Sequence, residues 1–270
     1  MSYKVIAFDL DGTLLNSQGQ ILPSSKNAIA QACAKGVKVV LVSGRHHTAM
    51  RPYYYELGLD TPVICCNGTY IYDFTTDLVL SANPLLAQQA KKVIETGKRF
   101  GTHLLMYSRD AMNYQVLNEH MTKFNQWVQH CPSNVRPNLR QVDDFMQIVD
   151  SGDTIWKFVI SHPDRDIMEQ AVSALSTDEF SCEWSWVDRV DVANQGNSKG
   201  ARLLELLQMW HIDPQNVIAF GDNHNDTSML KAVGLGVAMS NAEAEVKQQV
   251  KLVTLTNDEN GIEQVLIQYL

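Results

Sequence analysis

The sequence has no long hydrophobic run and few of the residues that mark fibrous or low-complexity chains. Its 270 residues include only 15 glycines and 8 prolines, and 45% of them are hydrophobic. A membrane-spanning helix needs about 18 or more consecutive apolar residues, whereas apolar stretches here, such as residues 39–42, are much shorter. Two aspartates interrupt the N-terminal apolar stretch, and no signal-peptide cleavage pattern follows. We therefore expect a globular, cytoplasmic protein that does not enter membranes.

Paired cysteines, excess positive charge and nucleotide-binding motifs are also missing. The five cysteines show no CxxC or zinc-ligand spacing, which favours reduced thiols. With 22 basic and 30 acidic residues the net charge is −8, and this argues against a nucleic-acid partner because phosphate backbones bind basic faces. The absence of GxxxxGK[ST] and of a strand followed by GxGxxG argues against a P-loop kinase and a dinucleotide cofactor. We expect a small-molecule substrate, and no feature indicates an obligate protein partner.

Short apolar segments alternate with helical patterns at both ends of the chain. The strand-like segments are residues 5–8, 37–42, 63–66, 217–220 and 236–239. Strands that alternate with helices predict an α/β fold with a parallel sheet. The middle of the chain differs: it holds four of the five tryptophans and mixes β-like with helix-like pieces. We predict a core domain made of residues 1–82 and 187–270, with an α+β domain, residues 83–186, inserted into it.

Polar residues follow the predicted core strands directly. The carboxyl ends of parallel strands line the ligand crevice of such a sheet, so these residues should meet although they are far apart in sequence. They are Asp9, Asp11, Ser43, Asp222 and Asp226, and Lys199 at the start of a predicted helix could join them. Taken singly, each cluster also fits an acidic surface turn or a helix cap.

Together these residue types fit phosphoryl transfer. Two close carboxylates resist joint ionisation unless a cation shares them, and Mg²⁺ prefers such oxygen ligands. Asp9 is a candidate nucleophile that would form an aspartyl phosphate. Asp11 could protonate the leaving oxygen and then accept a proton from water. Lys199 and Ser43 would stabilise the charge on the phosphate oxygens.

Four motifs in order resemble the haloacid dehalogenase (HAD) superfamily, and within it the Cof-type phosphatases. They are FDLDGT (8–13), VSGR (42–45), NSKG (197–200) and GDNHND (221–226). The resemblance implies a Rossmann-like core, Mg²⁺ dependence and an aspartyl-phosphate mechanism. It assigns metal binding to Asp9, Asp222 and the backbone carbonyl of Asp11. It assigns phosphate binding to Leu10 through its backbone, Ser43, Gly44, Lys199 and Asn225, with Thr13, Arg45 and Asp226 in support.

The first two motifs are too close for an inserted domain, so the insert resembles a C2-type cap that determines substrate specificity. Candidate substrate contacts are Asn67, Gly68, Trp156, Lys157, Trp184 and Trp186. The tryptophans could stack on a flat ring or pack the cap's own sheet. Strand alternation predicts that Trp184 and Trp186 share one face. His46 and His47 are expected either at the entrance of the site or on a solvated helix start.

Local segments throughout the chain resemble the bacterial pyridoxal phosphate phosphatases of this family. They are residues 43–47, 65–73, 105–107, 156–158 and 182–186. This resemblance implies pyridoxal 5′-phosphate as a substrate, and sugar phosphates such as fructose 1,6-bisphosphate as further ones. Two alternatives remain open: a phosphotransferase or phosphomutase that uses the same aspartyl phosphate, and a non-catalytic protein that binds phosphorylated ligands.

Overall fold

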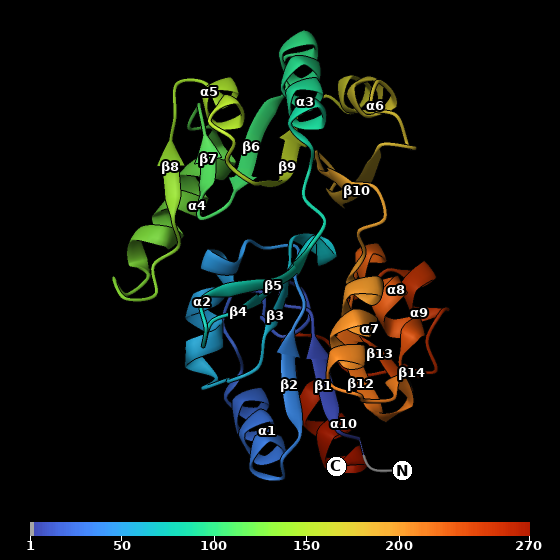
Figure 1. Cartoon of the computed structure of the whole chain (residues 1–270). Coiled ribbons are helices and arrows are strands. Elements are labelled where there is room, and N and C mark those ends of the chain that lie inside the picture. Colours follow the sequence, from blue (N-terminus) through green and yellow to red (C-terminus); the bar gives the residue numbers. More distant parts are fainter. Residues whose placement is uncertain (1–2) are drawn as a thin grey trace. The chain divides into compact units, whose positions relative to one another are not determined.

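The computed structural model describes residues 3–270, which divide into two compact units. The first unit comprises the chain up to Arg45, then Tyr53–Ser81 and Ser198–Leu270; the second comprises His46–Pro52 and Ala82–Asn197 (Figure 1). The second unit continues beyond residue 186, where we predicted that the insert ends. It does so because β11 (Arg189–Asn194) pairs with both β10 (Phe180–Trp186) and β9 (Ile155–Ser161).

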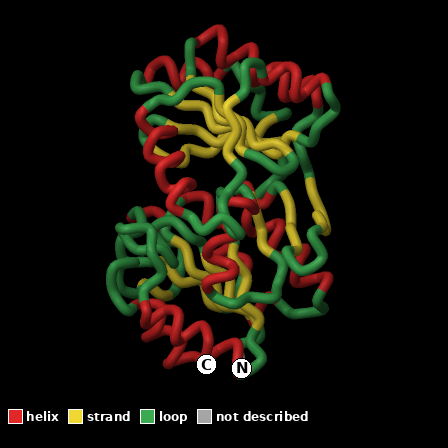
Figure 2. Tube along the Cα trace, turned by 90° about the vertical axis from the view of Figure 1, so that its left-hand side faces the viewer, coloured by secondary structure: helices red, strands yellow, loops and turns green. Residues whose placement is uncertain are grey.

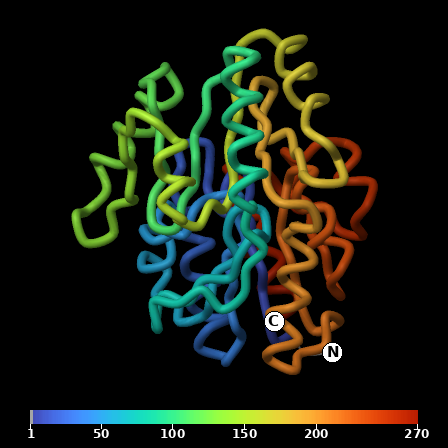
Figure 3. Tube along the Cα trace, turned by 45° about the horizontal axis from the view of Figure 1, so that its top comes forward, coloured from blue at the N-terminus to red at the C-terminus, as the bar shows by residue number. Residues whose placement is uncertain are grey.

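A five-stranded parallel sheet forms the centre of the first unit, which confirms the predicted α/β fold. The strand order is β14-β13-β12-β1-β2. β1 and β12 come from opposite ends of the chain yet lie side by side (Figure 3), and Phe8 is in register with Phe220. The strands are β1 (Val5–Phe8), β2 (Lys38–Leu41), β12 (Val217–Gly221), β13 (Leu235–Ala238) and β14 (Leu252–Val253).

Helices cover this sheet because both of its faces are apolar. Val5 and Ala7 belong to a core cluster with Leu203 and Leu206, while the alternate residue Ile6 is also fully buried, as a parallel sheet requires. Figure 2 shows helices packed beside the strands in each unit. The helices here are α1 (Pro23–Ala34), the part of α2 (His47–Glu56) from Tyr53 onward, α7 (Lys199–Met209), η2 (Pro214–Asn216), η3 (His224–Asp226), α8 (Thr227–Ala232), α9 (Ala244–Lys247) and α10 (Gly261–Tyr269).

A small three-stranded sheet continues from β2. An isolated parallel bridge joins Val42 to Ile64 in β3 (Val63–Cys65). The turn η1 (Cys66–Gly68) then leads to β4 (Tyr70–Asp73) and β5 (Leu78–Ala82). This arrangement brings the η1 turn to the same sheet edge as the end of β2.

The second unit is built on a six-stranded sheet, in agreement with the predicted α+β insert. The strand order is β10-β11-β9-β6-β7-β8, and only the β7–β8 pair is parallel. Met106, Phe158 and Val190 form a buried cluster with residues of three helices on one face. The further elements are β6 (His103–Ser108), β7 (Met112–Tyr114), β8 (Leu139–Gln141), α3 (Ala87–Phe100), α4 (Glu119–His130), α5 (Phe145–Asp150) and α6 (Arg165–Ser173). Across residues 3–270, no helix combines the length and the apolar character needed to cross a bilayer.

Candidate active site

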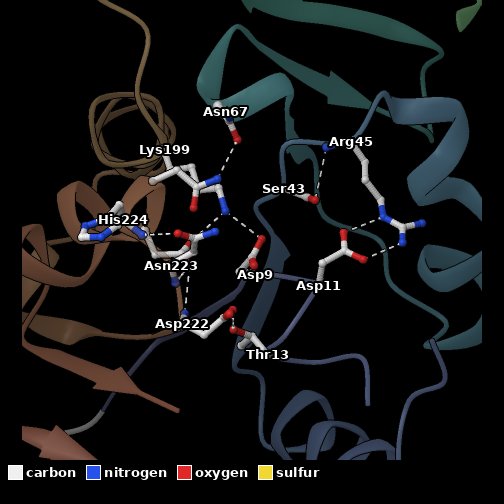
Figure 4. A network of polar contacts seen from close by, with 12 residues as sticks. Asp9, Asp11, Thr13, Ser43, Arg45, Asn67, Lys199, Asp222, Asn223 and His224 are labelled. Atoms are coloured by element: carbon white, nitrogen blue, oxygen red, sulfur yellow. Dashed lines mark hydrogen bonds and ion pairs between the residues drawn. The ribbon is translucent and has the colours of Figure 1, made fainter. Parts of the chain in front are cut away.

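Polar side chains from three strand ends of the first unit meet in one cluster (Figure 4). Asp9 follows β1, Ser43 follows β2, and Asp222 follows β12. The parallel register of these strands brings their carboxyl ends to the same edge of the sheet. The meeting of residues that we expected from the strand-end pattern therefore occurs.

Lys199 joins this cluster through two buried ion pairs. Its Nζ lies 2.7 Å from Asp9 Oδ1 and 2.6 Å from Asp226 Oδ1, and only 1% of the residue is exposed. Burial by itself would lower the pKa of Lys199, but the charges of Asp226 and Asp9 outweigh it and raise the pKa above its usual value. Lys199 is therefore a permanently charged group between two carboxylates.

Asp226 shapes the loop that follows β12. Its second oxygen, Oδ2, accepts hydrogen bonds from the backbone N–H groups of Asp222 at 2.9 Å and Asn223 at 3.0 Å. Both carboxylate oxygens of this fully buried residue are therefore engaged, one with Lys199 and one with the loop. This geometry fits the supporting role that we expected for Asp226.

The DxDGT turn packs closely against Asp222. Thr13 Oγ1 donates a hydrogen bond of 2.7 Å to Asp222 Oδ1. Gly12 has φ +78°, and a Cβ at this position would lie 2.3 Å from Asp222 Oδ2. Only glycine therefore permits both the left-handed backbone and the close approach, and Thr13 then orients the Asp222 carboxylate.

Three carboxylates gather at this point with a single lysine. Oxygens of Asp9, Asp222 and Asp226 all lie within 4.8 Å of one another. Burial, and then repulsion from Asp226 and Asp222, raises the pKa of Asp9 well above its usual value. Burial and repulsion from Asp226 likewise raise the pKa of Asp222 to about 7. Hard oxygen donors with excess negative charge fit a divalent cation such as Mg²⁺, which would offset this repulsion.

The Asp11 carboxylate does not belong to this group of three. The Arg45 guanidinium binds it with two hydrogen bonds, Nε to Oδ2 at 2.8 Å and Nη2 to Oδ1 at 2.7 Å. Desolvation acts to raise the pKa of Asp11, but the charge and hydrogen bonds of Arg45 outweigh it and lower the pKa. The Asp11 side chain is 62% exposed, so it is accessible for proton transfer.

Backbone groups beside Asp9 and Ser43 are available to an anion. Ser43 is buried, and its Oγ accepts a hydrogen bond of 3.2 Å from Arg45 N–H. Within residues 3–270, the N–H groups of Leu10 and Gly44 have no hydrogen-bond acceptor. Two N–H groups and a hydroxyl next to the lysine are suitable donors to phosphate oxygens.

The Asn67–Gly68 turn lies at the edge of the same cluster. Asn225 Nδ2 donates a hydrogen bond of 3.2 Å to Asn67 Oδ1. Gly68 has φ +89°, and a Cβ there would lie 2.1 Å from the carbonyl oxygen of Ser198, just before Lys199. The close approach of these two turns therefore requires glycine at position 68. Asn225 Oδ1 is buried and has no hydrogen-bond partner within the described part of the chain.

Trp156 and Lys157 lie in the second unit, and both are buried there. Trp156 Nε1 donates to the Arg109 carbonyl at 3.2 Å. Lys157 Nζ lies 2.5 Å from Asp191 Oδ2 and 4.8 Å from the centre of the Tyr107 ring. Sequence reasoning missed Asp191 and Tyr107, whose partnership with Lys157 becomes visible only through the strand register.

The prediction that Trp184 and Trp186 share one face is wrong. Trp184 pairs with Val190, while Trp186 pairs with the adjacent residue Arg189, because a register shift lies between the two tryptophans. Neighbouring residues of β11 point to opposite faces, so their partners do as well. Trp184 packs beside the helix-covered core, with the Arg165 guanidinium 3.4 Å from its ring centre, whereas Trp186 is 64% exposed.

The expectation that His46 and His47 lie on a solvated helix start is wrong. Both side chains are buried within the second unit, which excludes a solvated helix start. His46 Nε2 lies 2.9 Å from the Ser108 carbonyl oxygen, and its Nδ1 lies 2.9 Å from Thr48 Oγ1. Burial lowers the pKa of His46 to about 4, so this residue is a neutral structural group at pH 7.

Comparison with known proteins identifies the family of this chain. The family model of haloacid dehalogenase-like hydrolases matches residues 6–266. The chain belongs to this family. Its members generally use Mg²⁺ and an aspartyl-phosphate mechanism, and the protein is a phosphoric monoester hydrolase.

Similarity to individual family members extends over the whole chain. The pyridoxal phosphate phosphatase YbhA of Escherichia coli is 41% identical over 100% of both chains. The 5-amino-6-(5-phospho-D-ribitylamino)uracil phosphatase YwtE of Bacillus subtilis is 29% identical, with 99% of this chain and 98% of that protein covered. A haloacid dehalogenase-like hydrolase from Bacteroides thetaiotaomicron has the same fold, with a TM-score of 0.87 at 25% identity over 100% of both chains.

Proposed function

We propose that this enzyme hydrolyses pyridoxal 5′-phosphate, with Asp9 as the nucleophile and Asp11 as the general acid and base. The observation that carries the reaction is the buried cluster of Asp9, Lys199 and Asp226 beside Asp222. A charged lysine between the carboxylates of Asp9 and Asp226 is suited to hold an anionic group next to a nucleophile.

The chain's own residues account for both half-reactions. Asp9 Oδ1 is held by Lys199, so Oδ2 is the oxygen that attacks phosphorus. The bond from phosphorus to the ester oxygen breaks as the new bond to Asp9 forms. Arg45 favours the ionised form of Asp11, so Asp11 takes up a proton from solvent before this step and then donates it to the departing alcohol. Asp11 then accepts a proton from the water that attacks the aspartyl phosphate, which releases inorganic phosphate and restores Asp9.

Binding of the phosphate group falls to donors around Asp9. Lys199, Ser43 and the N–H groups of Leu10 and Gly44 would bind the non-transferring oxygens, and Asn225 would add its amide. Asp9, Asp222 and the backbone carbonyl of Asp11 would hold Mg²⁺. When bound, the ion supplies positive charge that offsets repulsion between the carboxylates and the phosphate.

The substrate proposal rests on similarity along the whole chain. The 41% identity to YbhA covers the second unit as well as the first, and in our proposal this second unit is the cap that contacts the leaving group. Pyridoxal 5′-phosphate is thus a substrate of the enzyme and not its cofactor. Sugar phosphates such as fructose 1,6-bisphosphate are proposed as further substrates.

A panel of phosphorylated metabolites tests this proposal. Release of inorganic phosphate should be measured with Mg²⁺ and no acceptor sugar, and substrates should be ranked by kcat/KM. We expect pyridoxal 5′-phosphate to rank above hexose phosphates, EDTA to abolish turnover, and added Mg²⁺ to restore it. Phosphate transfer only in the presence of an acceptor sugar would instead indicate a phosphotransferase, and no turnover of any ester would indicate a binding protein.

A further inference from the structure

A cavity of about 190 Å³ lies entirely within the second unit. Its floor is one face of the six-stranded sheet: Arg189, Ser161 and His103 are in register across β11, β9 and β6. Val159 and Leu105 form the next row on the same face. Residues 115–116 and the first turn of α4 form a wall, and the C-terminal turn of α3 lines the part where β7 has ended.

Positive charge is concentrated on this cavity. The cations Lys98 and Arg189 line it together with the imidazoles of His103 and His120, and no described residue in its lining is an aspartate or glutamate. The neighbouring acid Asp191 is already paired with Lys157 at 2.5 Å. The N-terminus of α4 favours a bound anion, whereas the C-terminus of α3 disfavours one. Because these two effects oppose each other, the charged side chains determine which ligand charge the cavity prefers.

Arg189 is the central cation of the cavity. Its Nε is 3.1 Å from Asp188 Oδ1, but its Nη1 faces the His120 ring, 3.1 Å from Nε2 and 3.2 Å from Nδ1. Burial, and then the charge of Arg189, lowers the pKa of His120. An arginine that faces a neutral imidazole has hydrogen-bonding capacity left for an anionic ligand.

The rest of the cavity is apolar and has room for a ring. Ile94, Leu104, Leu105, Val116, Met121 and Val159 contribute to its lining. A cavity of about 150 Å³ holds a benzene molecule, and a group the size of a water molecule needs roughly 30 Å³ more. The volume of about 190 Å³ is therefore sufficient for a six-membered ring with one small substituent. Thr102 Oγ1 is buried at this site and has no hydrogen-bond partner within the described residues, so it could donate a hydrogen bond to a ligand oxygen.

We infer that this cavity is a second ligand site, which binds a small anion carried on an apolar body about the size of benzoate. The anionic group pairs with Arg189 and the apolar body packs between Leu105, Val159 and Met121. The site uses none of the residues assigned to phosphate hydrolysis, so it does not depend on the proposed activity.

Binding of benzoate to the full-length protein tests this site, with neutral benzamide as the matched probe. Calorimetry should give one benzoate site and at least about tenfold weaker binding of benzamide, because a charge-assisted hydrogen bond is lost. Phenylphosphonate distinguishes a carboxylate from a phosphoryl ligand, and tight binding of either anion supports the site. Binding of neither anion, or equal binding of benzoate and benzamide, would overturn the proposal.

Variants and a local signal place the ligand in the cavity. Arg189→Met should weaken benzoate binding about tenfold or more, whereas Arg165→Met, on the helix-covered side of the same unit, should not change it. Lys98→Met and Arg99→Met provide a second comparison, because both side chains are exposed and their replacement should not impair folding. Only Lys98 lines the cavity, so only Lys98→Met should weaken benzoate binding. The pKa of His120, followed by NMR of its ring nitrogens, should rise on saturation with benzoate because the anion offsets the charge of Arg189. An unchanged His120 signal, or equal effects of Lys98→Met and Arg99→Met, would refute binding at this site.

Discussion

The Arg45 guanidinium binds the Asp11 carboxylate in a bidentate pair, with hydrogen bonds of 2.8 Å from Nε and 2.7 Å from Nη2. This pairing directs the Asp11 side chain away from the Asp9, Asp222 and Asp226 carboxylates and leaves it 62% exposed. Two aspartates only two residues apart therefore have different surroundings. Asp9 is buried against Lys199, and Asp11 is exposed against an arginine.

The first prediction concerns Arg45. Arg45→Met should lower kcat about tenfold or more, because Asp11 loses the two hydrogen bonds that orient it. Arg45→Lys should give an intermediate rate, since an ammonium group cannot form the same fork. Steady-state kinetics with pyridoxal 5′-phosphate measures both variants, and Arg99→Met controls for loss of a surface charge. A wild-type kcat in Arg45→Met would exclude this orienting role.

The second prediction separates activity from stability at Asp9. Asp9→Asn should reduce phosphate release at least about a thousandfold, because an amide cannot form the acyl phosphate. The raised pKa of Asp9 means that its charge is unfavourable in the folded protein without a cation. The melting temperature of Asp9→Asn in EDTA at pH 7 should therefore equal or exceed that of the wild type. Retained turnover would contradict the nucleophile assignment, and a large drop in melting temperature would contradict the electrostatic account.

Replacement of Asp226, unlike that of Asp9, should destabilise the folded protein. Asp226→Asn removes the charge that faces Lys199 and weakens the acceptor of two backbone hydrogen bonds. We expect the free energy of unfolding to fall by about 2–4 kcal/mol, as when one partner of a buried ion pair is removed. Denaturant unfolding checks this value, with the exposed Asp178→Asn as a control. Equal stability of the two variants would show that Asp226 does not hold the loop.

The fourth prediction is a pH dependence from His46. Its pKa is about 4 in the folded protein and 6.5 unperturbed, so the unfolded chain binds more protons between these values. The contribution of His46 to the free energy of unfolding should be fully present above pH 6.5 and should fall by about 3 kcal/mol as the pH decreases to 4. The neighbouring buried His47, whose pKa is also lowered, adds a further loss in the same direction. His46→Gln should flatten this part of the unfolding profile, while the exposed His130→Gln should not. An identical slope in wild type and His46→Gln would exclude His46 as its source.

The fifth prediction follows from the register shift between the two tryptophans. Trp184→Ala should reduce the free energy of unfolding by about 1–3 kcal/mol, because the ring packs on the core cluster and beneath Arg165. Trp186→Ala should change it by no more than about 0.5 kcal/mol, as expected for an exposed side chain. Thermal unfolding of the two variants under one set of conditions measures the difference. Equal losses would mean that both rings carry structural contacts.

Most of the first unit could be predicted from sequence because its signals are local. Runs such as Val217–Gly221 are apolar over a strand's length and end in polar residues. The rule that parallel strands present their carboxyl ends at one edge then predicted that Asp9, Ser43 and Asp222 would meet. The four motifs indicated the family, which the match over residues 6–266 confirms.

The sequence by itself determined the alternation of strands and helices, the family and the set of charged residues that follow the strands. Only the tertiary structure decided how those charges are shared, because the second oxygen of Asp226 binds a loop and the Asp11 carboxylate binds Arg45. It also decided the opposite faces of Trp184 and Trp186 and the burial of His46. A single shifted residue in a strand reverses every side chain beyond it, and the partners that bury a histidine lie far away in the sequence.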